Sequence, residues 1–228
     1  MGFLRNLIIA ALVILTGFIA ASAVNAGTTA YDAATNRIIM TGKTDNKLSW
    51  SLIETLTAHP EADGIVMYGS GGRMDAMVII MGTIKQSGLP VYIPEGKICA
   101  SACALAAVSS ETVTVGGWLL FHTGHISGYP QGATLNEINS AGQRMVIAML
   151  PHFVNIGFKL DFFGKLVRYT GPNKWVVVTD IEQINECRVT DASAEELMRP
   201  CYIAAPIKTT EQVVADVRAW YKEQQSKS

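Results

Sequence analysis

The feature that most constrains this sequence is the alternation of short apolar segments with segments of helical spacing along residues 36–124. The strand-like segments are residues 36–42, 63–69, 89–95 and 118–124. The helix-like segments between them are residues 46–60, 70–88 and 101–109. Strands separated by helices of this length form parallel sheets through βαβ crossovers. The pattern therefore predicts an α/β fold with a parallel sheet whose short apolar strands are buried on both faces.

The second half of the chain is predicted to be mainly helical. The expected helices cover residues 134–158, 160–171, 180–186 and 210–225. The first of them is either one long helix or two helices broken at Pro151. Residues 174–179 indicate a further strand, and Thr179 or Asp180 is expected to cap the helix that follows it.

Residues 1–26 have the pattern of a secretory signal peptide, with Arg5 ahead of an apolar stretch that ends in small residues. Cleavage is expected after Ala26 or after Ala23. The apolar stretch is short for a membrane span, which needs roughly 20 residues, and a retained N-terminal anchor is the alternative. The mature chain, residues 27–228, fits a single domain in the periplasm or outside the cell.

The net charge and the spacing of the histidines and cysteines argue against nucleic acid and metal ions as partners. The formal net charge is −1, so no basic field is available for nucleic acid. His122 and His125 are close in sequence, but no carboxylate lies near them, and no pair of cysteines has the spacing of a zinc site. Neither a metal nor another cofactor is expected, and no stable membrane span is expected once residues 1–26 are removed.

Four cysteines remain in the mature chain, at positions 99, 103, 187 and 201. An even number of cysteines in an exported chain predicts two disulfides, which four cysteines can form in three ways. Proximity in sequence favours Cys99–Cys103 and Cys187–Cys201, and buried free thiols are the alternative.

Three groups with chemical potential fall at the carboxyl ends of predicted strands, where ligand sites of α/β sheets lie. Gly71 and Gly72 stand between a strand and a helix, where free amide N–H groups bind anions, although glycine is also common in such turns for geometry alone. Ser101 begins a helix, so it is either an N-cap or a nucleophile. His122 ends the segment "WLLFH" and is a candidate general base, with His125 as the second choice.

The order of these motifs resembles the Clp protease proteolytic subunit and the wider Clp/crotonase-like superfamily, especially exported bacterial Clp-like proteins with a cysteine-flanked serine. The resemblance rests on "GSGG", "GKICASAC" and "LLFHTG" and covers about residues 37–126 well and residues 170–190 more loosely. It implies a fold of repeated ββα units. By position it implies Ser101 as nucleophile, His122 as its histidine and Gly71 and Gly72 as the oxyanion-hole glycines. The Ala102 amide, which follows Ser101 at the helix start, is expected to be a further donor beside Gly71.

The third residue of the expected triad departs from the family pattern. The family's serine peptidases have an aspartate just before an aromatic-led strand, whereas Asn173 stands at the matching position here, two residues before Trp175. An asparagine can fix the imidazole tautomer but supplies no negative charge. Asp180 is the alternative orienting residue, and Cys99 or Cys103 is the alternative nucleophile.

The sequence thus predicts an exported serine peptidase-like hydrolase that cleaves peptide bonds in a peptide or protein substrate. By resemblance, self-association into a homo-oligomer is also expected. Two other functions remain open at this point: a catalytically weak or inactive Clp-like scaffold or binding protein, and a crotonase-type enzyme acting on thioesters.

Export should remove the apolar N-terminal segment, because its charge, length and terminal small residues match the requirements of a signal peptidase. Mass spectrometry of the exported protein is expected to show an N-terminus at Gly27 or Val24. Recovery of the soluble exported protein with an intact Met1 would contradict this prediction.

Overall fold

The computed structural model describes residues 27–122, 148–171, 173–189 and 193–227. The predicted signal peptide, its cleavage sites at Ala23 and Ala26, and His125 lie outside the described residues. None of the helices in the described ranges is both long enough and apolar enough to cross a membrane.

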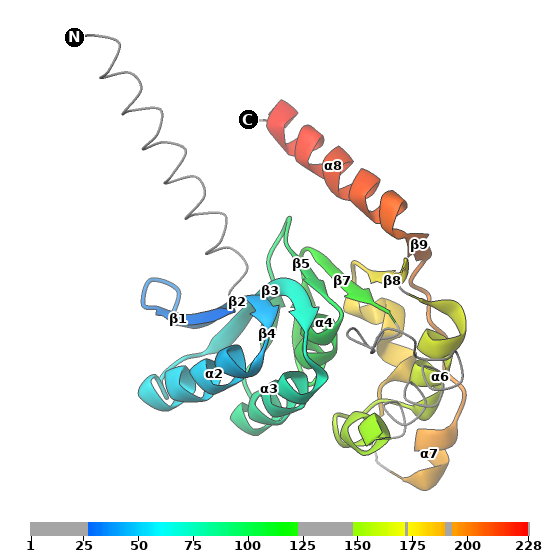
Figure 1. The fold of residues 1–228 in the computed structure, drawn as a ribbon, viewed down its shortest axis with the longest axis horizontal. Coiled ribbons are helices and arrows are strands. Elements are labelled where there is room, and N and C mark those ends of the chain that lie inside the picture. The colour runs from blue at the N-terminus through cyan, green and yellow to red at the C-terminus, as the bar shows by residue number, and fades with distance from the viewer. Residues whose placement is uncertain (1–26, 123–147, 172, 190–192, 228) are drawn as a thin grey trace, which may run out of the picture.

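The predicted strands and helices between residues 36 and 122 are present, and the fold is mixed α/β (Figure 1). The structure adds short strands at residues 28–32, 98–100 and 113–115, so two strands follow one another at several points. The strands are β1 (Thr28–Asp32), β2 (Arg37–Thr44), β3 (Gly64–Gly72), β4 (Val91–Ile93), β5 (Ile98–Ala100), β6 (Val113–Val115), β7 (Trp118–Phe121), β8 (Lys174–Val178) and β9 (Ile207–Thr209). The helices are α2 (Asn46–Ala58), α3 (Met74–Ser87), α4 (Ala102–Ala107), α6 (Leu160–Tyr169), the 3₁₀ helix η1 (Ile181–Cys187), α7 (Ala194–Met198) and α8 (Thr210–Lys227). Residues 148–155 are also helical, so Pro151 does not end that helix.

The sheet is parallel in its centre and antiparallel at its ends, so the prediction of a parallel sheet is correct only in part. The order along the sheet is β1-β2-β3-β5-β7-β8-β9, and β4 and β6 branch from β3. The pairs from β2 through β3 and β5 to β7 are parallel. β1 pairs antiparallel with β2 because the connection between them is too short for a crossover. β8 and β9 extend the other end, also antiparallel.

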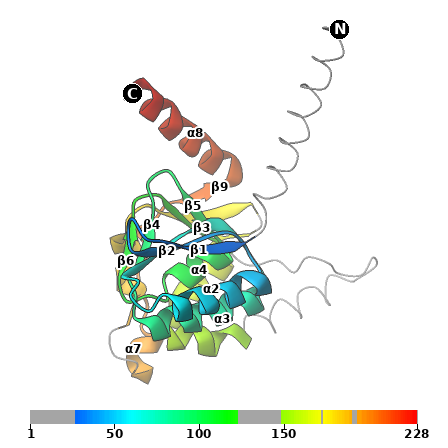
Figure 2. The same cartoon turned by 90° about the vertical axis from the view of Figure 1, so that its left-hand side faces the viewer.

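Both faces of the sheet are covered, but by different elements. The helices α2, α3 and α4 lie on one face, while α8 lies on the opposite side of the sheet and extends away from it (Figures 1 and 2). In β7 the side chains of Leu119 and Phe121 join the large core on the helical face. Trp118 and Leu120 join a smaller cluster, to which α8 contributes Val213. This two-sided burial explains the uninterrupted apolar segment that predicted β7.

Local signals in the sequence set several helix ends. Asp45 caps α2 by accepting the Leu48 amide at 2.9 Å. Gly88 ends α3 in the left-handed conformation, with φ of 65°, which glycine adopts without a steric penalty. Asp180, one of the two predicted caps, begins η1 and forms a capping box with Gln183.

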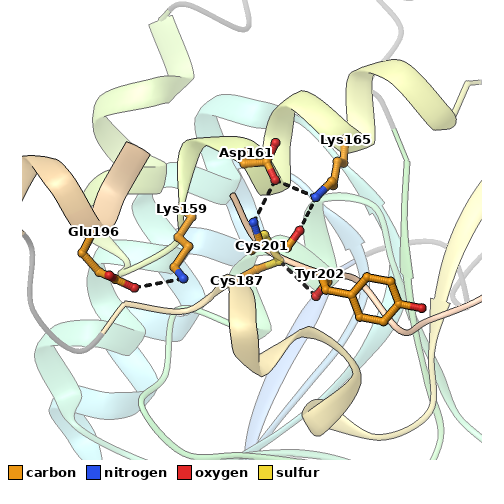
Figure 3. The surroundings of a disulfide bond; sticks show 7 residues. All are labelled: Lys159, Asp161, Lys165, Cys187, Glu196, Cys201 and Tyr202. Atoms are coloured by element: carbon orange, nitrogen blue, oxygen red, sulfur yellow. Dashed lines mark hydrogen bonds and ion pairs between the residues drawn. A yellow bond between two sulfur atoms is a disulfide. The ribbon is translucent and has the colours of Figure 1, made fainter. Parts of the chain in front are cut away.

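The four cysteines form two disulfides, Cys99–Cys103 and Cys187–Cys201. Figure 3 shows the second, beside which Asp161 of α6 accepts hydrogen bonds from the Lys165 ammonium at 2.6 Å and from the Cys201 amide at 2.9 Å. These interactions, the Lys165 bond first, hold the pKa of the Asp161 carboxyl below its ordinary value. The Asp161 carboxylate thus fixes the segment around Cys201 to α6, and the disulfide fixes it to the end of η1.

Replacing Cys187 and Cys201 together by alanine should lower the free energy of unfolding by about 3 kcal/mol, because the bridge closes a loop with a sequence separation of 14. The Cys99→Ala/Cys103→Ala double variant is the matched control. Its loop has a separation of only 4, so about 2 kcal/mol is expected. Denaturant unfolding without reductant measures both losses, and a larger loss for the short loop would contradict the prediction.

Candidate active site

Ser101 occupies the turn between β5 and α4 in an unusual backbone conformation. Its φ and ψ are 57° and −122°, a region that non-glycine residues rarely adopt and that costs of order 1–3 kcal/mol. Its amide donates to the Leu120 carbonyl at 2.7 Å, which ties the turn to β7. The side chain makes no capping bond to α4. The Ser101 side chain therefore does not act as an N-cap of α4.

His122 directly follows β7 and faces Ser101. β5 and β7 are parallel neighbours, with Ala100 opposite Leu120. Because the carboxyl ends of parallel neighbours meet at one edge, Ser101 and His122 come together although they are 21 residues apart. The Ser101 Oγ and His122 Nε2 atoms are 2.7 Å apart. This is the separation at which a histidine can accept the proton of a serine nucleophile.

Gly71 lies beside Ser101 because β3 is the other neighbour of β5, with Gly69 opposite Cys99. An added Cβ at Gly71 would lie 2.7 Å from the Ser101 Cβ and 2.9 Å from the Ala102 nitrogen. Only glycine leaves this space open, and its φ of +80° also favours glycine. The structure thus brings Gly71, Ser101, Ala102 and His122 together.

Gly72 differs from Gly71 in its neighbours. Both glycines are the last residues of β3 rather than a turn after it, which corrects the prediction. They stay in the strand because β2 continues alongside, with Thr44 opposite Gly72. An added Cβ at Gly72 would lie 2.1 Å from the Thr44 carbonyl oxygen. The close contact of Gly72 is therefore with β2 and not with Ser101.

The two predicted orienting residues, Asn173 and Asp180, are both exposed. Asn173 is exposed just before β8, and its carbonyl accepts the Thr210 amide at 3.1 Å. Asp180 is exposed and its carboxylate accepts the Glu182 amide at 3.1 Å as the cap of η1. Neither is among the contacts of the His122 ring that the structure describes. The role of the Asn173 side chain therefore stays a prediction.

The aromatic residue that contacts His122 is one that the sequence did not single out. Phe121 is opposite Val176 in the antiparallel pair of β7 and β8, which places Trp175 next to His122. The two ring centroids are 4.1 Å apart and the rings are inclined by 39°. The indole N–H donates to the Thr210 hydroxyl at 3.0 Å. The sequence shows a tryptophan near the start of the predicted strand, but its contact with His122 depends on the direction in which β8 pairs with β7.

Asp75, an acidic residue close to Gly71 and Gly72 in sequence, is paired with Arg73. Arg73, which follows β3, donates to both carboxylate oxygens of Asp75 at 3.0 and 2.6 Å. These hydrogen bonds hold the pKa of the Asp75 carboxyl below its ordinary value. Asp75 is thus an ionised partner of Arg73 and is unsuited to donate a proton at neutral pH.

The Cys99–Cys103 disulfide spans Ser101, joining the buried strand β5 to the buried helix α4. A disulfide sulfur is not a thiolate, which is the nucleophilic form of cysteine. Neither Cys99 nor Cys103 therefore has a free thiol with which to attack a substrate. In the described ranges, no three His, Cys, Asp or Glu side chains are grouped as a metal site would need.

Comparison with known proteins gave matches among solved structures alone. No protein-family model matches the chain, and no curated protein does. A mutant of the 1510-N membrane-bound stomatin-specific protease is 19% identical, with a TM-score of 0.48, covering 70% of this chain and 80% of that one. A second mutant, in complex with a substrate peptide, is also 19% identical, with a TM-score of 0.47 and coverage of 70% and 75%. A mutant of ClpP1 from Listeria monocytogenes is 13% identical, with a TM-score of 0.48 and coverage of 72% and 95%.

Gly71→Ala should reduce the rate at which a fluorophosphonate modifies Ser101 by about 100-fold, because the new methyl group would displace the Ser101 turn. Peptide mass spectrometry measures that rate. Gly82→Ala is the matched control, since an added Cβ there meets nothing within 4 Å. The control should keep the native rate and gain about 0.5–1 kcal/mol of stability. Native reactivity in Gly71→Ala would contradict the close approach seen here.

Proposed function

We propose that the chain is an exported serine peptidase-like hydrolase that cleaves peptide bonds, with Ser101 as nucleophile and His122 as general base. The observation that carries the proposal is the 2.7 Å contact between the Ser101 hydroxyl and His122 Nε2. It occurs at a serine whose backbone is strained and whose hydroxyl does not cap its helix. A strained strand-to-helix turn is also how the nucleophilic serine of α/β-hydrolases is presented.

The proposed reaction is acyl transfer in two halves. The Ser101 oxygen attacks the substrate carbonyl carbon while its proton passes to His122 Nε2. The imidazolium then gives that proton to the leaving amine, and the carbon–nitrogen bond breaks to leave an acyl-serine. Water, deprotonated by the same imidazole, releases the acid and restores the Ser101 hydroxyl. Each half requires one base and one acid, and His122 supplies both.

The developing oxyanion would be held by backbone amides. The Ala102 nitrogen lies in the space beside Gly71, next to Ser101. Donors in such a position stabilise a tetrahedral intermediate and are worth about 2.7–4 kcal/mol each when removed. Gly71 and Ala102 are the proposed donors. Gly72, the third predicted donor, makes its close contact with Thr44, and its part in the oxyanion hole rests on the sequence resemblance alone.

Peptide bonds are the proposed substrate because the motif order resembles the Clp proteolytic subunit, and the fold of repeated ββα units is proposed on the same ground. Export is proposed from the pattern of residues 1–26, and the two disulfides support it, because disulfides persist in oxidising compartments. We further propose that residues 27–228 act as one domain and that the protein forms a homo-oligomer. A third residue of the triad is proposed at Asn173.

Ser101→Ala should abolish fluorophosphonate labelling and peptide hydrolysis, while changing the melting temperature little, because the lost hydroxyl caps no helix. His122→Ala should reduce labelling strongly as well, since the serine would keep its proton. Labelling and hydrolysis of a fluorogenic peptide mixture by the mature protein measure these effects.

Ser70→Ala is the matched control, because Ser70 is an exposed serine of the same sheet edge, in β3, and should behave as the native protein does. If the native protein shows neither labelling nor hydrolysis, the peptidase proposal fails and a scaffold or binding role on this fold takes its place.

A further inference from the structure

Trp175 contacts His122 from the side of β8, and this contact extends the proposed machinery beyond Ser101 and His122. We propose that Trp175 is a positioning residue that holds the His122 imidazole toward Ser101 and stabilises its protonated form. The inference rests on the proposed function for its catalytic meaning. The positioning itself concerns only the two rings, whose centroids are 4.1 Å apart.

The indole ring is fixed at both ends, which a positioning group requires. Its backbone lies in β8, paired with β7 on one side and with Lys208 of β9 on the other. Its N–H donates to the hydroxyl of Thr210, the first residue of α8. The Thr210 amide in turn donates to the Asn173 carbonyl, two residues before Trp175. These two hydrogen bonds therefore hold the indole between β8 and the start of α8.

Packing on this face of the sheet restricts the ring further. Trp175 packs against a buried cluster of Ala100, Trp118, Leu120, Val177 and Val213. Ala100 immediately precedes Ser101, and Leu120 accepts the Ser101 amide. The same cluster thus supports the indole and the turn that carries the serine.

The ring has an electrostatic effect on His122 as well as a steric one. When Ser101 transfers its proton, the imidazole becomes a cation beside the π face of an indole, the aromatic ring that attracts cations most strongly. The charge nearest to Trp175 in β9 is that of Lys208, whose ammonium is paired with Asp216 at 2.6 Å. Lys174 precedes Trp175 and is exposed to solvent. The indole is therefore placed to favour the imidazolium in the reaction.

The test of positioning measures the His122 ring directly and requires no activity. Diethyl pyrocarbonate modifies accessible imidazoles, and peptide mass spectrometry reads the rate at each histidine. Trp175→Leu should raise the rate at His122 at least threefold, and Trp175→Phe, which keeps an aromatic ring but loses the bond to Thr210, should raise it less. Thr210→Val, which removes only the bond to the indole, should raise it by a smaller factor. His59, which stacks on Tyr31 at 4.0 Å, is the internal reference.

Val176→Ala is the matched control, because Val176 adjoins Trp175 in β8 but its side chain is buried in the large core and not in the cluster that supports the indole. It should leave the rate at His122 unchanged. If Trp175→Leu does not fold, as judged by circular dichroism, Thr210→Val decides the question. Native rates at His122 in both Trp175→Leu and Thr210→Val, or an equal increase in Val176→Ala, would overturn the inference.

A second readout connects the contact to catalysis. Trp175→Leu should slow fluorophosphonate labelling of Ser101 about tenfold in the native background and have no further effect in a His122→Ala background. Equal slowing in both backgrounds would show a general structural effect and would overturn the inference. If native Ser101 is not labelled at all, the proposed function fails, while the modification rates at His122 still decide whether Trp175 positions the ring.

Discussion

The parallel pairing of β5 with β7 is the interaction on which the candidate site depends. It places Ala100 opposite Leu120, so that the residues following these strands, Ser101 and His122, end at the same edge of the sheet. The bond from the Ser101 amide to the Leu120 carbonyl holds the turn in its strained conformation. A shift of one residue in this register would turn one of the two side chains to the other face, because strand side chains alternate.

A second constraint is the close approach of β3 to the same turn. Gly71 leaves room for the Ser101 Cβ and the Ala102 nitrogen at distances that no side chain at position 71 would permit. The Cys99–Cys103 disulfide closes the turn from within, joining the strand before Ser101 to the helix after it. Strand pairing, glycine and disulfide therefore act on one residue, and together they offset the cost of its backbone conformation.

The antiparallel strands β8 and β9 connect the candidate site to the face of the sheet on which α8 packs. β8 brings Trp175 to His122, and the start of α8 fixes the indole through Thr210. The second face is thus connected to the site through a ring contact and one hydrogen bond. The helix α8 is far from Ser101 and His122 in sequence, yet it supports Trp175, which contacts His122.

The sequence predicted the main strands and helices and several helix ends, whereas the short elements β1, β5, β6, β9 and α7 were not predicted. The apolar segments predicted the strands because they are buried on both faces, as in β7. Asp45, Gly88 and Asp180 act through neighbours a few residues away, so their roles can be read locally. The sequence also gave Ser101 and His122 as candidates and favoured the two disulfide pairs, because those cysteines are close along the chain.

Tertiary structure alone decided which distant groups meet. The direction of β8 depends on the path of the preceding chain, which no local pattern records, and this direction brought Trp175 to His122. Likewise, Gly72 faces Thr44 because β2 runs on beside the end of β3. Local propensity acts over a few residues, whereas these contacts arise from strand pairing between segments separated by tens of residues.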